Sequence, residues 1–127
     1  MKKFHDLVVW KNAHQLVLDV YRITENFPAE ERMGLSSQMR RTAMLVPGTI
    51  VEGYSSGKIQ DFIHAMMAAE NALTRLQYYI ELSRELGYLY HDQMALLLDN
   101  METINQLLCG VRIQVNKEPA HAPATIS

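Results

Sequence analysis

Apolar residues recur at steps of three and four in four separate stretches of the chain, with turn-forming residues between the stretches. This spacing is typical of helices that bury one face. The sequence therefore predicts helices at about residues 7–26, 36–54, 58–86 and 92–115, and no strand. Because the connections are short, consecutive helices should pack antiparallel. We expect an all-α fold, an antiparallel up-down four-helix bundle.

The fourth predicted helix has the most regular pattern. Its apolar side chains alternate between steps of three and four residues, which is the spacing of a narrow core seam in a helical bundle. The seam comprises Met94, Leu97, Met101, Ile104, Leu108, Val111 and Val115.

A single domain should account for almost the whole chain. We expect the bundle to occupy residues 1–116, which is enough chain to bury a core without a disulfide or a metal. The segment 117–127 is rich in Pro and Ala and has no hydrophobic period. We therefore expect a disordered tail there.

The first predicted helix has more apolar surface than one core requires. At about 100° per residue its apolar positions cover an arc of roughly 200°, whereas a helix that buries one face needs little more than about 100°. Large apolar patches left on a monomer usually mark interfaces. We therefore expect a homo-oligomer, with candidate interface residues Val9, Trp10, Leu16, Val17 and Ile23.

The second predicted helix has an uncharged middle between Arg41 and Glu52. Those two charges are separated by roughly 16 Å along a helix axis, so they cannot pair with each other. Buried charges are usually paired, and we interpret Arg41 and Glu52 as structural polar residues with partners on another helix or chain. Arg40 points about 100° away from Arg41 on the helix. One arginine would then serve structure, while the other faces solvent or a phosphate.

Composition excludes a generally basic, nucleic-acid-coating protein. The 127 residues carry a net charge of −2, so any RNA or DNA binding must come from a local patch or from patches multiplied by symmetry. One cysteine, Cys109, fits a reducing compartment, and the N-terminus lacks the apolar core of a signal peptide. We expect a cytoplasmic protein with no membrane span.

Catalytic and metal-binding patterns are sparse. A di-metal bundle needs two Glu-x-x-His motifs together with carboxylates from the other helices, whereas this chain offers Asp61-x-x-His64 once. Cys109 lies off the helix-four seam and has no histidine nearby in sequence. We expect no catalytic residues, no metal and no cofactor.

Several short motifs together resemble those of one protein family, the 23S rRNA-intervening sequence proteins. The similarity covers about Phe4 to Val115. The motifs are Phe4-x-Asp6-Leu7-x-Val9-Trp10-Lys11-x-Ala13, Val20-Tyr21, Phe27-Pro28-x-x-Glu31, Gly34-Leu35-x-x-Gln38-x-Arg40-Arg41, Pro47-x-x-Ile50-x-Glu52-Gly53 and Leu86-Gly87-Tyr88-Leu89.

The resemblance implies an up-down bundle and a ring-shaped homo-oligomer, and pentamers occur among relatives. Similar proteins of diversity-generating retroelements partner a reverse transcriptase and bind RNA through basic surface. This sequence departs from the family pattern in three places. The family usually has Ala-Asn where Gly48-Thr49 stands, Gly-Ser where Asn71-Ala72 stands, and an acidic Glu-Leu-Glu where Arg75-Leu76-Gln77 stands.

Two functions from different classes follow from these observations. The first is an oligomeric, non-enzymatic scaffold that contacts RNA or an RNA-handling protein, with candidate nucleic-acid contacts Lys2, Lys3, Arg40, Arg41 and Arg75. The second is a structural protein–protein interaction module that docks a partner helix on its apolar surface. The wide apolar arc of the first helix favours both equally.

Overall fold

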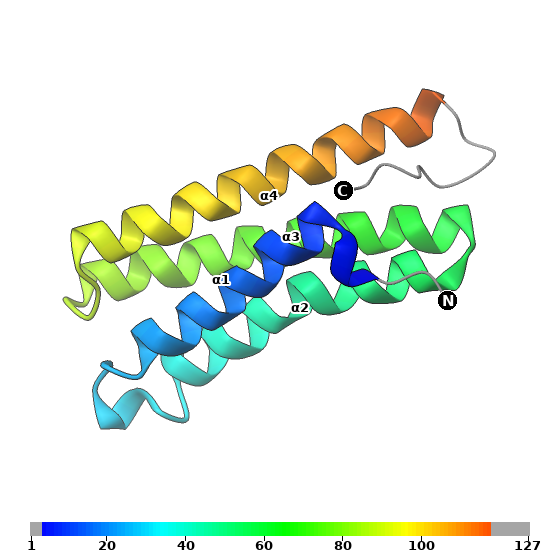
Figure 1. The fold of residues 1–127 in the computed structure, drawn as a ribbon. Helices are drawn as coiled ribbons and strands as arrows, with labels where there is room; N and C mark the ends of the chain where they lie inside the picture. Colours follow the sequence, from blue (N-terminus) through cyan, green and yellow to red (C-terminus); the bar gives the residue numbers. More distant parts are fainter. Residues whose placement is uncertain (1–3, 118–127) are drawn as a thin grey trace.

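Four long helices make up most of the protein in the computed structural model, which describes residues 4–117 and their side chains as far as position 114 (Figure 1). They are α1 (Val8–Thr24), α2 (Leu35–Ser56), α3 (Ile59–Glu85) and α4 (His91–Lys117). Two short 3-10 turns accompany them, η1 (Phe4–Asp6) before α1 and η2 (Ala29–Glu31) between α1 and α2. The described range contains no strand, so the prediction of an all-α, four-helix protein is confirmed.

The ends of the chain lie partly outside this range. Helix α4 continues to Lys117, slightly beyond its predicted end at 115. The rest of the predicted tail, 118–127, lies outside the described residues, and so do Lys2 and Lys3.

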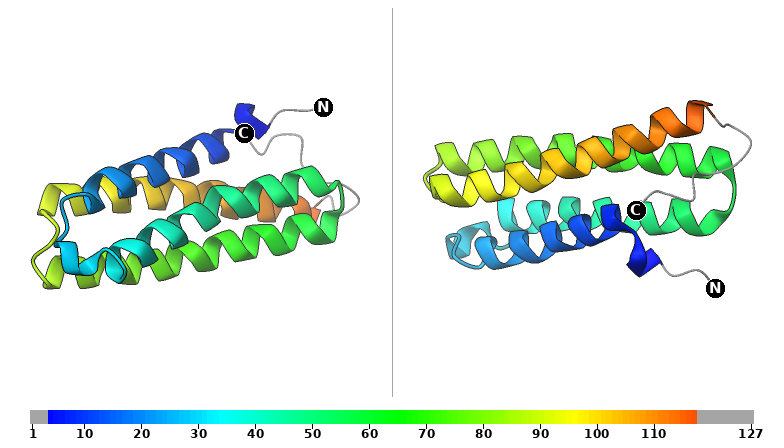
Figure 2. Two further views of the ribbon diagram at one scale, coloured as in Figure 1. Left: turned by 90° about the horizontal axis from the view of Figure 1, so that it is seen from below. Right: turned by 45° about the horizontal axis from the view of Figure 1, so that its top comes forward.

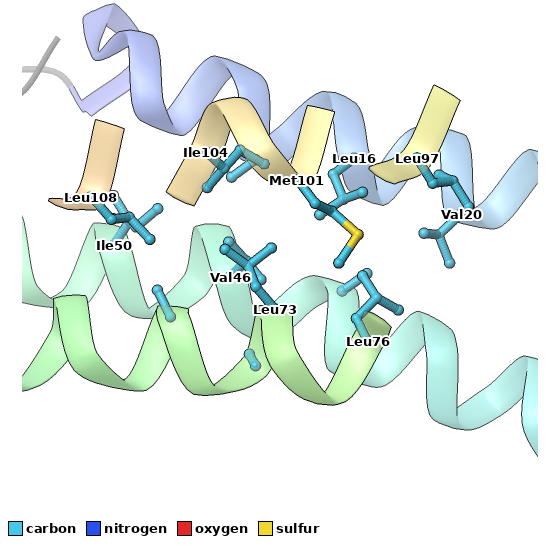
Figure 3. Close-up of a cluster of buried hydrophobic side chains, with 14 of the residues drawn as sticks. Leu16, Val20, Val46, Ile50, Leu73, Leu76, Leu97, Met101, Ile104 and Leu108 are labelled. Atoms are coloured by element: carbon cyan, nitrogen blue, oxygen red, sulfur yellow. The ribbon is translucent and has the colours of Figure 1, made fainter. Parts of the chain in front are cut away.

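Each helix contacts two others. Helix α1 lies against α2 and α4, and α3 lies against the same two helices, so the four enclose one core (Figures 1 and 2). Figure 3 shows side chains from all four helices meeting there. The seam predicted for α4 is confirmed from Leu97 to Val111, where all five of its residues are buried, whereas Met94 is half-buried at the edge of the core.

Polar contacts join α4 to its neighbours. Arg112 Nη1 donates to Glu70 Oε1 of α3 over 2.9 Å, and Asn100 Nδ2 donates to the backbone oxygen of Asn12 in α1 over 3.0 Å. These contacts lie at the rim of the core, where the side chains remain partly exposed to solvent. Such contacts orient the helices more than they stabilise the fold.

Helices α2 and α3 approach each other most closely at Gly53. This glycine is buried, and a Cβ atom built on it would overlap the Cβ of Ala65. Only the absence of a side chain lets the two backbones come this near, because protein interiors leave no spare space. The glycine of the Glu52-Gly53 motif therefore sets the spacing between α2 and α3.

Glu31 ties the turn before α2 to the loop between α3 and α4. Its Oε1 accepts a hydrogen bond from the backbone N–H of Leu35 over 3.1 Å, and its Oε2 accepts one from the Tyr88 hydroxyl over 3.0 Å. The first bond caps α2, whose own N-cap residue, Gly34, has no side chain to do so. The hydrogen bond to the Glu31 carboxylate raises the pKa of Tyr88 above its usual value.

The structure corrects the expected oligomer interface at three of its positions. Val9, Leu16 and Ile23 are 0%, 0% and 8% exposed within the single chain, so they pack in its own core and not against a second copy. The apolar arc of α1 is wide because that helix faces two neighbours, α2 and α4. Trp10 and Val17 are half-buried at the edge of the core.

An aromatic cluster covers the beginning of α1. The indole ring of Trp10 stacks on the imidazole of His14, with ring centroids 4.9 Å apart and planes inclined by 6°. Phe4 and His5 of η1 pack edge-on against the same indole. Residues that precede α1 therefore fold back over it and cover part of the apolar surface that the sequence assigned to an interface.

Candidate nucleic-acid interface

A cleft of about 430 Å³ opens where the end of α1, the turn η2 and the first half of α2 meet. Three arginines line it, Arg32, Arg40 and Arg41, with one acidic residue, Glu25. Such an excess of positive charge around a concave surface attracts anions, because the low-dielectric walls focus the field.

The spacing of residues on α2 and the position of the turn explain why these side chains meet. Ser37, Arg41 and Met44 follow one another at steps of four and three, so they share one helix face that borders the cleft. Arg32 comes from the segment that leads into α2. The cleft also borders the first turn of α2, where backbone N–H groups and the helix dipole add positive potential.

Arg40 is the arginine that contacts the rest of the protein. Its Nε donates to Thr24 Oγ1 over 2.8 Å and its Nη2 donates to the backbone oxygen of Tyr21 over 3.2 Å. The guanidinium carbon lies 4.5 Å from the centroid of the Tyr21 ring, in a cation–π contact. Arg40 therefore joins the end of α1 to the first half of α2.

This arrangement reverses the roles predicted for the charges of α2. Arg41 and Glu52 were interpreted as structural polar residues, but both side chains are exposed and neither forms a hydrogen bond or ion pair with another described residue. Within the described chain the expected burial and pairing are therefore not found, because both side chains lie exposed at the rim of a cleft, Arg41 beside the end of α1 and Glu52 beside the beginning of α3. A partner in a second copy of the chain stays a prediction. Arg40 has the structural contacts instead, and Arg41 is the arginine that faces solvent.

The predicted nucleic-acid contacts separate into distinct places. Arg40 and Arg41 both line the cleft, whereas Arg75 is exposed on α3 and does not. Lys2 and Lys3 lie outside the described residues. Arg32 was missed by the sequence analysis, because its segment was interpreted as a connecting turn. Its position three residues before the start of α2, the helix that also contains Arg40 and Arg41, was the available signal.

A second, smaller cleft of about 350 Å³ lies near the end of α2 and the beginning of α3. Its lining includes Glu52, Asp61 and His64. Within residues 4–117, no group of three or more histidine, cysteine, aspartate or glutamate side chains is close enough together to hold a metal ion. Cys109 is exposed on α4.

A helix that crosses a bilayer must be both long and apolar. In the described part of the chain, no helix combines the length and the apolar character that crossing a bilayer requires.

One known protein family matches most of the chain. The model of the 23S rRNA-intervening sequence protein family matches residues 5–110. The chain belongs to this family. The match confirms the resemblance drawn from the sequence motifs, and several motif residues of this 23S rRNA-intervening sequence protein have visible roles, as in the hydrogen bond between Glu31 and Tyr88 and the close approach at Gly53.

A solved structure has the same fold. It is the crystal structure of a protein of unknown function from the S23 ribosomal protein family of Bacteroides thetaiotaomicron VPI-5482. The two chains are 20% identical with a TM-score of 0.73, and the similarity covers 82% of this chain and 97% of the other. No protein with a curated description matches the chain.

Proposed function

We propose that the protein is a non-enzymatic, homo-oligomeric scaffold that binds RNA at the cleft between α1, η2 and α2. The observation that supports this most is the grouping of Arg32, Arg40 and Arg41 around one cleft that contains a single acid, Glu25. Arginine is the side chain best suited to phosphate, because its planar fork of N–H donors matches two phosphate oxygens at once.

The overall charge makes the cleft the natural place for such binding. With a net charge of −2, the protein as a whole does not attract a polyanion, so affinity must arise where positive charge is concentrated. The family name refers to 23S rRNA, and the solved neighbour is described as a member of the S23 ribosomal protein family. Both descriptions favour RNA over other anionic polymers.

The assembled form that we propose is a ring of antiparallel, up-down bundles, with five copies as in relatives. Short connections favour the antiparallel order. Apolar side chains that remain at the surface favour assembly: Met44 and Leu45 of α2 are 45% and 46% exposed, and Trp10 and Val17 of α1 are half-buried. A ring would repeat the arginine cleft on every copy, and the reducing cytoplasm is the compartment that suits its single cysteine.

The test is RNA binding as a function of salt. We expect the full-length protein to bind a fluorescently labelled single-stranded RNA at about 50 mM salt and to lose affinity steeply towards about 200 mM, as measured by anisotropy. Arg32→Gln and Arg41→Gln should each weaken binding and reduce the slope of log K against log salt by about 0.7.

Arg75→Gln is the matched control, because it removes the same charge from an exposed site on α3. It should bind RNA as the unmodified protein does. Absence of binding at about 50 mM salt would contradict the proposed function. Equal weakening by Arg75→Gln and Arg41→Gln would show that RNA binds elsewhere than in the cleft.

A further inference from the structure

The three arginines of the cleft differ in how firmly they are held. The side chains of Arg32 and Arg41 are exposed, and neither guanidinium makes a hydrogen bond to another described residue. The Arg40 guanidinium donates two hydrogen bonds, to Thr24 Oγ1 and to the Tyr21 backbone oxygen, and it lies over the Tyr21 ring. The cleft therefore combines two exposed, unbonded guanidinium groups with one whose orientation is fixed by hydrogen bonds before any ligand arrives.

The acceptors of Arg40 are themselves fixed. Thr24 is 3% exposed, and its hydroxyl donates to the backbone oxygen of Val20 over 2.7 Å, which leaves an oxygen lone pair for Arg40 Nε. The Tyr21 oxygen belongs to the last turns of α1, where carbonyl groups carry the negative end of the helix dipole. Rotation of the guanidinium would break both bonds, so its plane persists.

The guanidinium carbon of Arg40 lies over the Tyr21 ring, no second aromatic ring among the described residues is in such contact with it, and Arg40 lines the cleft. The face of the guanidinium turned away from Tyr21 is the one that a ligand in the cleft could stack on. A flat, charged surface of this kind suits a nucleobase, because bases stack on arginine planes as well as on aromatic rings. A phosphate group, which has no flat face, does not require such a surface. Arg32 and Arg41 offer phosphate contacts beside it, on the same cleft.

We propose that the cleft holds one unpaired nucleotide of RNA, with its base stacked on the free face of the Arg40 guanidinium and its flanking phosphates bound by Arg32 and Arg41. This rests on the proposed function and specifies its ligand as single-stranded. A cleft of about 430 Å³ is at the small end of the range for small-molecule sites. In a duplex, bases are paired and stacked on one another and leave no free face to insert.

The test is a competition experiment with the full-length protein and a labelled single-stranded RNA of about eight nucleotides. Three unlabelled competitors of equal length are compared by anisotropy: the same RNA, a ribose-phosphate strand without bases, and a blunt RNA duplex. We expect the strand without bases and the duplex each to compete about tenfold or more weakly than the RNA itself. Equal competition by the strand without bases would overturn the stacking proposal and leave backbone binding intact.

Variants separate the plane of Arg40 from its charge. Arg40→Lys keeps the positive charge but has no planar group, so the preference for RNA over the strand without bases should fall to near unity. Arg41→Lys is the matched control and should keep that preference. Tyr21→Phe retains the ring beneath the guanidinium and should keep it too. An unchanged preference in Arg40→Lys, with thermal unfolding confirming a folded protein, would overturn the proposal.

The same experiments distinguish this inference from the broader one. If no RNA binds at low salt, the proposed function fails and the stacking proposal fails with it. If RNA binds but base-free and duplex competitors perform as well as the single strand, the cleft recognises backbone phosphate, and the nucleotide proposal alone fails. If free nucleoside monophosphate displaces the RNA as effectively as the RNA strand does, the ligand is a free nucleotide and the assignment to RNA is overturned.

Discussion

Gly53 shows how a single residue determines the approach of two helices. A Cβ atom at this position would overlap that of Ala65, whereas one at Gly48, five residues earlier on the same helix, would meet no atom within 4 Å. In an open helix interior, replacing glycine by alanine is stabilising by about 1 kcal/mol, because alanine restricts the unfolded chain. The two glycines of α2 therefore predict opposite outcomes for the same substitution.

We expect Gly53→Ala to lower the free energy of unfolding by about 1–3 kcal/mol, since α2 and α3 must move apart. Gly48→Ala, the matched control, should raise it by about 0.4–1 kcal/mol. Urea denaturation followed by circular dichroism measures both. If the two variants changed stability in the same direction, the proposed closeness of α2 and α3 at Gly53 would be wrong.

The hydrogen bond between Tyr88 and Glu31 makes the free energy of unfolding depend on pH in alkaline solution. The Glu31 carboxylate raises the pKa of Tyr88 above 10.0, its ordinary value, so the folded state holds the phenolic proton more tightly than the unfolded state does. Stability from this group is fully present below pH 10.0 and is lost as the pH rises through the folded-state pKa.

The expected result is that Tyr88→Phe reduces the loss of stability above about pH 10. The free energy of unfolding is measured by denaturation at several values between about pH 8 and pH 11. Tyr78→Phe is the control, because the Tyr78 hydroxyl has no hydrogen bond to another described residue, and it should follow the unmodified curve. A Tyr88→Phe curve that parallels that of the unmodified protein would refute a role for the bond to Glu31.

Sequence reasoning placed Arg40 and Arg41 at the candidate site but exchanged their roles. Helical periodicity gives the direction of a side chain around its own axis, and it correctly separated the two arginines by about 100°. It does not show which direction meets an acceptor. The acceptors of Arg40, Thr24 Oγ1 and the Tyr21 backbone oxygen, exist at that place because α1 ends there and packs against α2.

At the scale of elements, helices with a strong period were predictable and their exact ends were less so. The seam of α4 identified core residues directly, because apolar residues at steps of three and four lie along one face of a helix. The second helix was expected from about residue 36, whereas α2 begins at Leu35 and is capped by Glu31, which lies outside the helix. A cap supplied from a preceding turn leaves little trace in the helix sequence itself.

The Glu31 cap yields a prediction about α2. Glu31→Ala removes the acceptor for the Leu35 N–H and the partner of Tyr88, and should destabilise the protein by about 1–2 kcal/mol in chemical denaturation. Glu30→Ala is the matched control, since the Glu30 side chain is exposed and makes no hydrogen bond to α2, and it should change stability by less than about 0.5 kcal/mol. Similar effects of the two substitutions would argue against capping by Glu31.

The width of the apolar arc of α1 was correctly observed and incorrectly assigned. An arc of roughly 200° exceeds one core stripe. In this bundle, however, α1 lies between α2 and α4, and η1 folds back over Trp10. Val9, Leu16 and Ile23 are therefore core residues. The pattern along one helix cannot report how many neighbours surround it.

At the scale of the whole molecule, the proposed ring predicts the mass of the protein in solution. We expect light scattering at micromolar protein to give a mass several times that of the chain, with five copies as the expected number. Leu45→Glu should lower that mass without loss of helical signal, because Leu45 is 46% exposed and outside the core. Leu96→Glu on α4, 53% exposed, provides the control on another face of the bundle.

A monomeric mass at every concentration would contradict the proposed scaffold. Equal dissociation by Leu45→Glu and Leu96→Glu would show that assembly does not depend on the α2 surface in particular.

Fold class, helix number and family were all within reach of the sequence, since each depends on local periodicity or on motifs. The arginine cleft was not, because it is formed by three segments that meet only in the folded molecule.

The stacked pair of Trp10 and His14 gives the protein an internal optical probe. Trp10 is the single tryptophan, and it lies eleven positions before Tyr21, or about 16 Å along the axis of α1 from the arginine cleft. Indole emission changes when a neighbouring ring is separated from it. The fluorescence of this protein should therefore respond to unfolding at the beginning of α1 and stay constant while a ligand fills the cleft at the other end.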